Sequence, residues 1–179
     1  MADTTSASDA DQVERTQRLW GAGFAALRIL FGLVYLSNAV AKLVDVSVFR
    51  VGPVGGNLIA RSNARDILTG AAQDTWLGPL GALYENLVLP NWGFFGWFLV
   101  VAEFAIAIGL LLGIATRLAA LGALALIGPI WLMLLDEGPY LWSYPVELVP
   151  LLILAIVPAG RVLGVDRRLA VRFGGRWPF

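Results

Sequence analysis

Four long apolar segments alternate with polar, turn-rich stretches along this sequence. A helix rises about 1.5 Å per residue, so roughly 20 residues cross a hydrocarbon core of about 30 Å. The stretches "GIATR" and "DEGPYLWSY" between the later segments are short, so successive segments are expected to be antiparallel neighbours. The pattern predicts an all-α fold, a membrane four-helix bundle within residues 19–163. Its predicted spans are residues 19–44, 93–114, 118–135 and 144–162.

The segments outside these spans differ in character. Residues 1–18 are rich in Ser, Thr, Ala and Asp and cannot bury enough apolar surface to offset chain entropy, which predicts a disordered tail. Residues 45–92 form a loop too long for a simple connection. Apolar residues near helical period after Gly78 predict a short helix there, which lies either in the membrane interface or on the bundle as a lid. Residues 164–179 form a basic tail.

Lysine and arginine are distributed unevenly between the two ends of the predicted spans. One end carries eight arginines, whereas the other carries Lys42 and three arginines deeper in the long loop. Because cytoplasmic ends hold the excess of these residues, we expect both termini in the cytoplasm. The eight arginines are Arg15, Arg18, Arg117, Arg161, Arg167, Arg168, Arg172 and Arg176. The expected outer aromatic belt is Trp76, Trp92, Tyr140, Trp142 and Tyr144, with Trp20 on the inner side.

Composition supports a bilayer as the solvent and narrows the possible chemistry. The chain is 58% hydrophobic and 15% charged, whereas a soluble domain is about 45–50% apolar and about 25% charged. It has no cysteine and no histidine, which excludes iron–sulfur ligation and most haem, zinc and copper sites. No metal is therefore predicted. The formal net charge of the chain is zero, and nothing in it resembles a nucleic-acid-binding module, so no nucleic-acid partner is predicted either. Electron transfer would need a borrowed organic cofactor.

Two ionisable residues lie near the middle of the predicted spans. An ionised group at mid-membrane costs about 2.5–3.5 kcal/mol, so Arg28 and Glu103 should face protein or water. Counted from Trp20 and Gly93, Arg28 lies about 12 Å from the inner boundary and Glu103 about 15 Å from the outer one. These depths nearly coincide in a core of roughly 30 Å. The sequence therefore predicts an Arg28–Glu103 contact, direct or through one water.

Further polar residues fall on the same face of the first predicted helix. At 100° per residue, Tyr35 and Lys42 share an arc with Arg28, and Asn38 flanks it. Lys42 and Glu147 lie near the outer boundary and form a second candidate pair, with Asp136 and Glu137 as rival partners for Lys42. Lys42 and Glu147 could instead extend to water. The central pair could clamp the helices or form a ligand or proton site.

Three stretches together resemble the DoxX/DoxD family. They are "LRILFGLVYLSNAVAKL", "AEFAIAIGLLLGIATRLAAL" and "AGRVLGVDRRL". With its long first loop and "LPNWGFFGW", the chain is most similar to the DoxD branch, the small subunit of thiosulfate:quinone oxidoreductase. The resemblance implies a four-helix bundle in a bacterial or archaeal cytoplasmic membrane. Some members take part in quinone reduction and others in membrane redox complexes, so the bundle alone does not identify the reaction.

These observations lead to two functional hypotheses. The first is a membrane subunit of a quinone-linked oxidoreductase, with quinone as substrate and thiosulfate as the electron donor that the resemblance implies. Glu103 would carry protons, and the residues expected to bind quinone are Arg28, Tyr35, Asn38, Lys42 and Glu147. The second is a non-catalytic scaffold that anchors a redox or envelope complex. Both imply contact with membrane lipid and either a partner subunit or a homo-oligomer.

Overall fold

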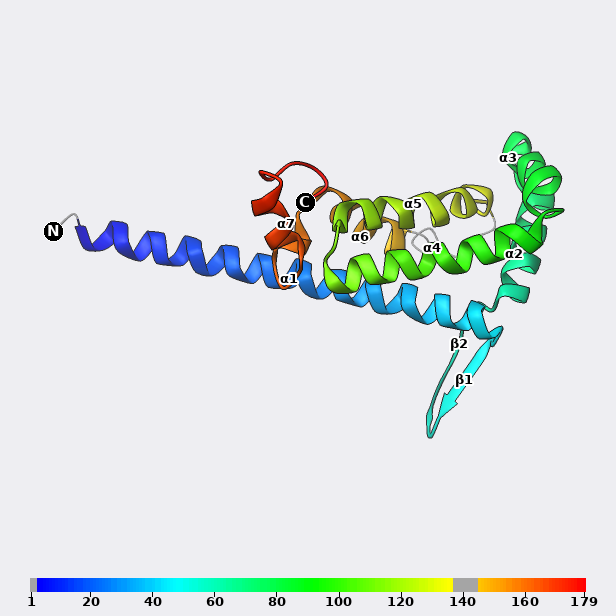
Figure 1. The fold of residues 1–179 in the computed structure, drawn as a ribbon, viewed down its shortest axis with the longest axis horizontal. Coiled ribbons are helices and arrows are strands. Elements are labelled where there is room, and N and C mark those ends of the chain that lie inside the picture. Colours follow the sequence, from blue (N-terminus) through cyan, green and yellow to red (C-terminus); the bar gives the residue numbers. More distant parts are fainter. Residues whose placement is uncertain (1–2, 137–144) are drawn as a thin grey trace.

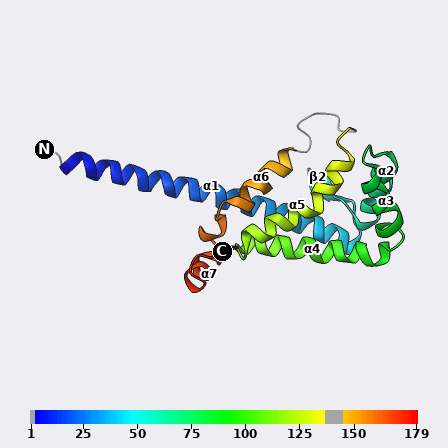
Figure 2. The ribbon, with the colours of Figure 1, turned by 90° about the horizontal axis from the view of Figure 1, so that it is seen from above.

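The architecture is almost entirely helical, as the sequence predicts. A computed structural model describes residues 3–136 and 145–179. Four helices pack side by side: α1 lies against α4, α4 against α5, and α5 against α6 (Figure 1, Figure 2). The elements in chain order are α1 (Asp3–Val44), β1 (Val48–Val51), β2 (Val54–Asn57), α2 (Arg61–Asp74), α3 (Gly78–Leu83), η1 (Tyr84–Val88), α4 (Trp92–Leu112), α5 (Thr116–Met133), α6 (Pro145–Ile156), η2 (Ala159–Arg161) and α7 (Asp166–Arg172).

Three of these helices are long and apolar enough to cross a membrane. Within the described residues they are Asp11–Val44, Trp92–Leu112 and Thr116–Met133. Many large apolar side chains on their outer faces are exposed, Phe94 and Val101 among them, each at 66%. Such a surface is expected where lipid replaces water. The chain therefore has the features of a membrane protein.

The fourth apolar helix is shorter than predicted. The sequence predicts a span over residues 144–162, but α6 ends at Ile156. Pro158 explains the stop, because proline lacks a backbone N–H and disfavours helical geometry in the residue before it. Residues 157–162 then form a turn and the short helix η2. Tyr144, predicted as the first residue of this span, lies outside the described residues, as do Tyr140 and Trp142 of the predicted aromatic belt.

The N-terminal segment differs from its prediction. The sequence predicts a disordered tail over residues 1–18, but α1 begins at Asp3 and continues to Val44 without a break. The helix projects beyond the packed helices (Figure 1), and residues 11–20 are all exposed. Local interactions support it there, including an ion pair between Arg18 and Glu14, one helical turn apart at 2.6 Å. Composition could not reveal this helix, because residues 11–18 are all exposed and bury no apolar face.

The long connection between α1 and α4 is partly helical, as predicted. It begins with a two-stranded antiparallel hairpin in which Val48 pairs with Asn57 and Val51 with Val54. Gly52 turns the hairpin at φ +60°, a conformation that favours glycine. Helix α2 follows. Helices α3 and η1 together occupy the region predicted as one short helix after Gly78. Leu80 and Tyr84 pack with Leu68 of α2 and Met133 of α5, so this region lies on the packed helices as a lid.

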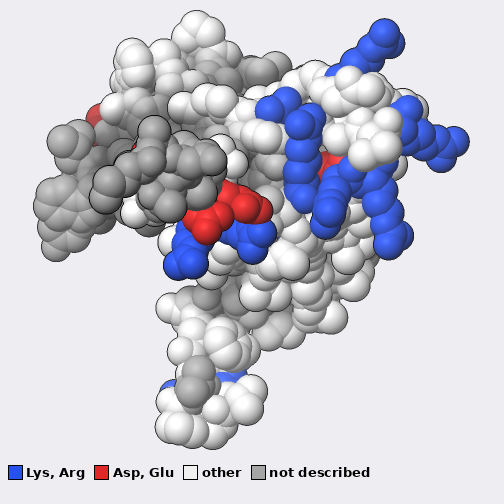
Figure 3. Space-filling model, turned by 90° about the vertical axis from the view of Figure 1, so that its left-hand side faces the viewer, with Lys and Arg blue, Asp and Glu red and all other residues white. Residues whose placement is uncertain are grey.

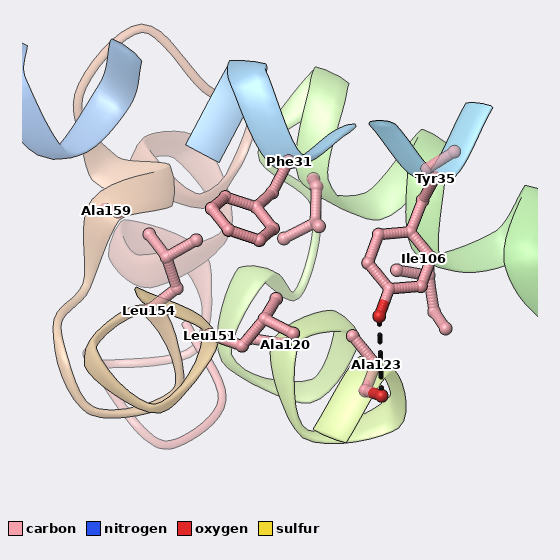
Figure 4. Packing of buried hydrophobic residues seen from close by; sticks show 10 residues of the cluster. Phe31, Tyr35, Ile106, Ala120, Ala123, Leu151, Leu154 and Ala159 are labelled. Atoms are coloured by element: carbon pink, nitrogen blue, oxygen red, sulfur yellow. Dashed lines mark hydrogen bonds between the residues drawn. The ribbon is translucent and has the colours of Figure 1, made fainter. Parts of the chain in front are cut away.

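The main core lies where α1, α4, α5 and α6 meet. Large side chains such as Phe31 and Leu151 pack between small ones such as Ala120 and Ala123 (Figure 4). Alanine and glycine let helices approach closely. At Gly109, an added Cβ would lie 2.9 Å from the Cβ of Ala119, so this glycine is needed for the α4–α5 contact. The core holds the polar residues of α1 against the other helices.

Candidate functional site: a polar pocket among the packed helices

A small pocket lies where α1, α4 and α6 meet beneath α2. Its volume is about 140 Å³. Apolar side chains from α2, α4 and α5, such as Leu68, Leu99 and Ile127, form much of its wall. Its polar lining consists of Tyr35, Asn38, Lys42, Glu103 and Glu147. The structure thus brings together five of the six residues that sequence reasoning expected at a site, and it leaves Arg28 out.

The strongest interaction in the pocket is an ion pair between α1 and α4. Lys42 Nζ lies 2.9 Å from Glu103 Oε1. Both residues are buried, with exposed fractions of 3% and 7%. An ion pair this short is also a charge-assisted hydrogen bond, and burial removes the water that would screen it. Lys42 therefore does not extend to water, which was one of the alternatives for this side chain.

The predicted contact between Arg28 and Glu103 is wrong. The prediction assumed that the spans begin at the two membrane boundaries, but α4 extends past the end of α1 towards α2 and α3 (Figure 1). Glu103 lies eleven residues into α4, about 16 Å from its start, and still reaches Lys42, two residues before the end of α1. Arg28 lies fourteen residues from Lys42 along α1, about 21 Å away.

The second oxygen of Glu103 is available to a ligand. Glu103 Oε2 is buried and has no hydrogen-bond partner among the described residues. Buried polar atoms are nearly always satisfied, so an orphan acceptor in a pocket wall indicates a missing partner such as a water or a ligand. Asn38 adds to this, because its side-chain amide lines the pocket and makes no hydrogen bond to the described residues. The pocket thus presents one free acceptor and one free amide.

A second polar contact joins α1 to α6. The hydroxyl of Tyr35 lies 3.3 Å from Glu147 Oε1 and 3.5 Å from the backbone oxygen of Ala123 on α5 (Figure 4). The hydroxyl has one hydrogen, so it can donate to only one of these acceptors at a time. Glu147 and Glu103 line the same pocket. The pocket therefore holds two neighbouring carboxyl groups and one lysine among its described residues.

The predicted Lys42–Glu147 pair is not formed. Lys42 is bound to Glu103, and the side-chain partner of Glu147 in the described part of the chain is Tyr35. Of the two rival partners for Lys42, Asp136 is exposed after the end of α5 and makes no ion pair within the described residues. The other, Glu137, lies outside the described residues.

Arg28 is a structural residue at the opposite end of the packed helices. Its side chain is fully buried and donates to the backbone oxygens of Leu110, Leu111 and Leu163, the last two at 3.1 and 3.0 Å. The final carbonyls of a helix lack partners within the helix, so Arg28 satisfies the end of α4. Gly113 makes room for it, because an added Cβ would lie 2.7 Å from Arg28 Nη1. We therefore assign Arg28 no part in the pocket.

The end of the packed helices that holds Arg28 also anchors the C-terminal segment. Asp166, the first residue of α7, accepts hydrogen bonds from the backbone N–H groups of Ala115 and Thr116 at 2.7 and 2.9 Å. These groups lie at the start of α5, where N–H groups have no partners within the helix, so Asp166 acts as a cap supplied from far along the chain. The predicted tail over residues 164–179 is therefore anchored to the packed helices and includes α7.

Sequence reasoning missed the helix that covers the pocket. In α2, Ala64, Leu68 and Ala71 are buried at spacings of four and three residues, a helical signal that was present in the sequence. Two contacts hold α2 in place. The guanidinium of Arg61 lies 4.3 Å from the ring centroid of Trp97 on α4, and this cation–π contact fixes one end.

The second contact of α2 is with the residue that follows α1. Asp45 Oδ1 accepts hydrogen bonds from the backbone N–H and the hydroxyl of Ser62 at 2.9 and 3.0 Å. These hydrogen bonds lower the pKa of the Asp45 carboxyl, because they stabilise its charged form. Asp45 thus caps the first turn of α2 from outside the helix.

Comparisons of the chain with protein-family models, with curated proteins and with solved structures gave no match. The resemblance to the DoxX/DoxD family therefore stays a prediction.

Proposed function

We propose that this protein is an integral membrane subunit of a quinone-linked oxidoreductase, and that the pocket beneath α2 binds the quinone ring. The observation that carries the proposal is the orphan oxygen of Glu103, which lies beside a buried lysine in a small, largely apolar cavity. A buried ion pair with an unsatisfied atom is costly in apolar surroundings unless a ligand or water completes it. Polar groups of this kind in a membrane protein are functional candidates by default.

The size of the pocket fits a single ring. An apolar cavity of about 150 Å³ is large enough to bind benzene, and this pocket measures about 140 Å³. Leu99 and Ile127 offer the apolar walls that a flat ring requires, and the carbonyl oxygens of a quinone require donors. Asn38 and Lys42 carry N–H groups for that purpose. A ring with two opposite carbonyls is therefore a good chemical match to this lining.

The proposed division of labour follows from the residues available. Reducing a quinone to a quinol takes two electrons and two protons. Glu103 can take up and release a proton at its carboxylate, so it is the proposed proton carrier. The chain has neither cysteine nor histidine for a metal redox centre, so the two electrons are assigned to a donor oxidised on a partner subunit. If the donor is thiosulfate, two ions release these electrons as they join through a new sulfur–sulfur bond.

The proposed membrane arrangement has both termini in the cytoplasm. Arginines gather at the end that holds Arg28 and α7, whereas the pocket lies towards the α2 end. Cytoplasmic ends are enriched in arginine and lysine, which supports this orientation. In this arrangement α6 belongs to the fourth crossing, and the pocket lies nearer the outer surface of the cytoplasmic membrane.

Ligand binding is the most direct test. The full chain, purified in a mild detergent, should release a quinone on solvent extraction and should bind a short-chain ubiquinone or menaquinone analogue in a calorimetric titration. The test variant is Asn38→Leu, because this amide has no partner to lose and its replacement leaves the ion pair intact. We expect a loss of about five- to thirtyfold in affinity, the equivalent of one hydrogen bond of roughly 1–2 kcal/mol.

The matched control is Asn86→Leu. Asn86 is exposed in η1 outside the pocket, and among the described residues its amide donates only to the backbone oxygen of Ala82. This variant should bind the analogue like the wild type. An Asn38→Leu variant that folds normally and binds the quinone analogue with unchanged affinity would remove the pocket from consideration.

One observation favours the scaffold hypothesis as a second candidate. The Lys42–Glu103 and Tyr35–Glu147 contacts tie α1 to α4 and α6, so these residues can serve solely to fix the helix arrangement. A scaffold would co-purify with its partner from native membranes but bind no quinone. Partner recovery without quinone, and unchanged turnover of the assembled complex in the Asn38→Leu variant, would select this alternative.

A further inference from the structure

A second surface of the chain carries features that the pocket does not explain. Residues 161–179 contain five arginines and one acidic residue, Asp166. Asp166 is buried at 2% exposure and is occupied at the start of α5. The exposed side-chain charge of this segment is therefore entirely positive.

Four of the arginines form what we call the basic surface: Arg167, Arg168, Arg172 and Arg176. All four are exposed, and none makes an ion pair or a side-chain hydrogen bond with the described residues. Basic side chains crowd together on this end of the molecule (Figure 3). Arg161 differs, because it donates to the backbone oxygens of Gly175 and Phe179 at 3.3 and 2.6 Å and so holds the segment in a folded-back shape.

Large apolar side chains alternate with these arginines. Leu163 is 79% exposed, Val171 84% and Trp177 56%. In water, each would expose apolar area at a cost of about 25 cal/mol per Å². Arginines interleaved with exposed aliphatic and aromatic residues are typical of segments that lie in a membrane interface, where apolar groups enter the acyl boundary and cations meet phosphates.

The position of the segment agrees with such an interface. Val162, near the start of the segment, packs against Gly21 of α1 so closely that an added Cβ on Gly21 would lie 2.9 Å from Val162 Cγ2. Gly21 stands at the start of the long apolar stretch of α1, next to the exposed Trp20. The basic surface therefore lies at the level where the apolar helices emerge from the hydrocarbon.

We propose that the basic surface binds the phosphate headgroups of anionic phospholipids, with Leu163, Val171 and Trp177 in contact with the acyl boundary. The exposed apolar residues favour a lipid over a soluble acidic partner, and arginines that form no ion pair within the described residues favour an anionic lipid over a zwitterionic one. This inference does not depend on the proposed quinone site. Each arginine near an anionic surface is expected to strengthen binding about fivefold.

The test measures lipid binding to the full chain. Protein in a non-ionic detergent is titrated with phosphatidylglycerol or with phosphatidylcholine, and bound lipid is counted by native mass spectrometry. We expect the wild type to prefer phosphatidylglycerol. The variant R172Q/R176Q should lose about 25-fold in phosphatidylglycerol affinity. The matched control R50Q/R65Q removes two exposed arginines from the β1 and α2 region and should bind like the wild type.

Three results would overturn the proposal. The first is equal affinity of R172Q/R176Q and the wild type for phosphatidylglycerol, with R167Q/R168Q as the second variant if the first one unfolds. The second is an equal loss in the R50Q/R65Q control, which would indicate a general charge effect. The third is displacement of phosphatidylglycerol by inorganic phosphate at equal concentration, which would indicate a site for a free anion that makes no use of the apolar residues.

Discussion

Replacing Lys42 by methionine tests the central contact of the structure. Methionine keeps much of the length of lysine but removes the ammonium, so Glu103 is left buried without its cation. Removing one partner of a buried ion pair costs about 3–5 kcal/mol in soluble proteins. We expect Lys42→Met to lower the unfolding free energy by about 3 kcal/mol, the lower end of that range. Water in a pocket of about 140 Å³ can hydrate part of the remaining carboxylate.

The double variant Lys42→Met/Glu103→Gln separates the interaction energy of the ion pair from the cost of leaving one charge buried alone. Replacing both members leaves no unpaired ion, and such replacements are often close to neutral. We expect the double variant to lie within about 1 kcal/mol of the wild type, with a coupling free energy of about 2 kcal/mol or more. The measurement is reversible unfolding of the full chain in detergent micelles, followed by far-ultraviolet circular dichroism.

A second cycle, with Arg28→Met and Glu103→Gln, provides the control. Arg28 contacts backbone oxygens at the other end of α4 and not Glu103, so these two substitutions should add within about 0.5 kcal/mol. The reasoning would be refuted by coupling in the Arg28–Glu103 cycle together with additivity in the Lys42–Glu103 cycle. That outcome would restore the pairing expected from depth alone.

Three further predictions concern the junctions around the pocket. Arg28→Met should destabilise the chain by about 1.5–3 kcal/mol, because charged hydrogen bonds to the end of α4 are lost, yet it should leave quinone affinity unchanged in calorimetric titration; a large drop in affinity would contradict its place outside the pocket. Gly113→Ala should cost about 1–2 kcal/mol of unfolding free energy for the left-handed conformation alone, since φ is +64° there, whereas Gly128→Ala, with open space around it, should cost little. Because the pKa of Asp45 is lowered by folding, its contribution to stability is present above the unfolded-state pKa, about 3.9, and is lost as the pH falls through the folded-state value. Proteolysis of the α2 region of the wild type should therefore accelerate in acid. Asp45→Asn should make the rate of proteolysis less dependent on pH.

Much of the architecture could be predicted from local patterns. Long apolar runs predicted α4 and α5 within a few residues of both ends, and α1 at its C-terminal end alone, because helix length and hydropathy are local properties. The shared face of Tyr35 and Lys42 was also predictable, because angular position on a helix depends only on sequence spacing. Both residues are buried on the inner face of α1.

The pairing of charges could not be predicted in the same way. It depends on the offset between α1 and α4 along their axes, and this offset results from the packing of the two helices against each other, which neither sequence segment reveals alone. Lys42 and Arg28 are fourteen residues apart, so an error of about four turns in the offset exchanges one for the other as the neighbour of Glu103. The cap that Asp166 supplies to α5 is equally non-local, because Asp166 and Thr116 are 50 residues apart in the sequence.

By itself, the sequence determined the chemistry of this protein: a largely apolar helical chain without cysteine or histidine, with a few ionisable residues inside its apolar helices. These properties follow from residue identity and spacing, which need no knowledge of the fold. Only the tertiary structure decided which charges meet, which side chain is left with an orphan oxygen, and that one arginine serves the helix ends instead of the pocket. Contacts between helices depend on their relative heights, and those heights result from the packing of the whole chain.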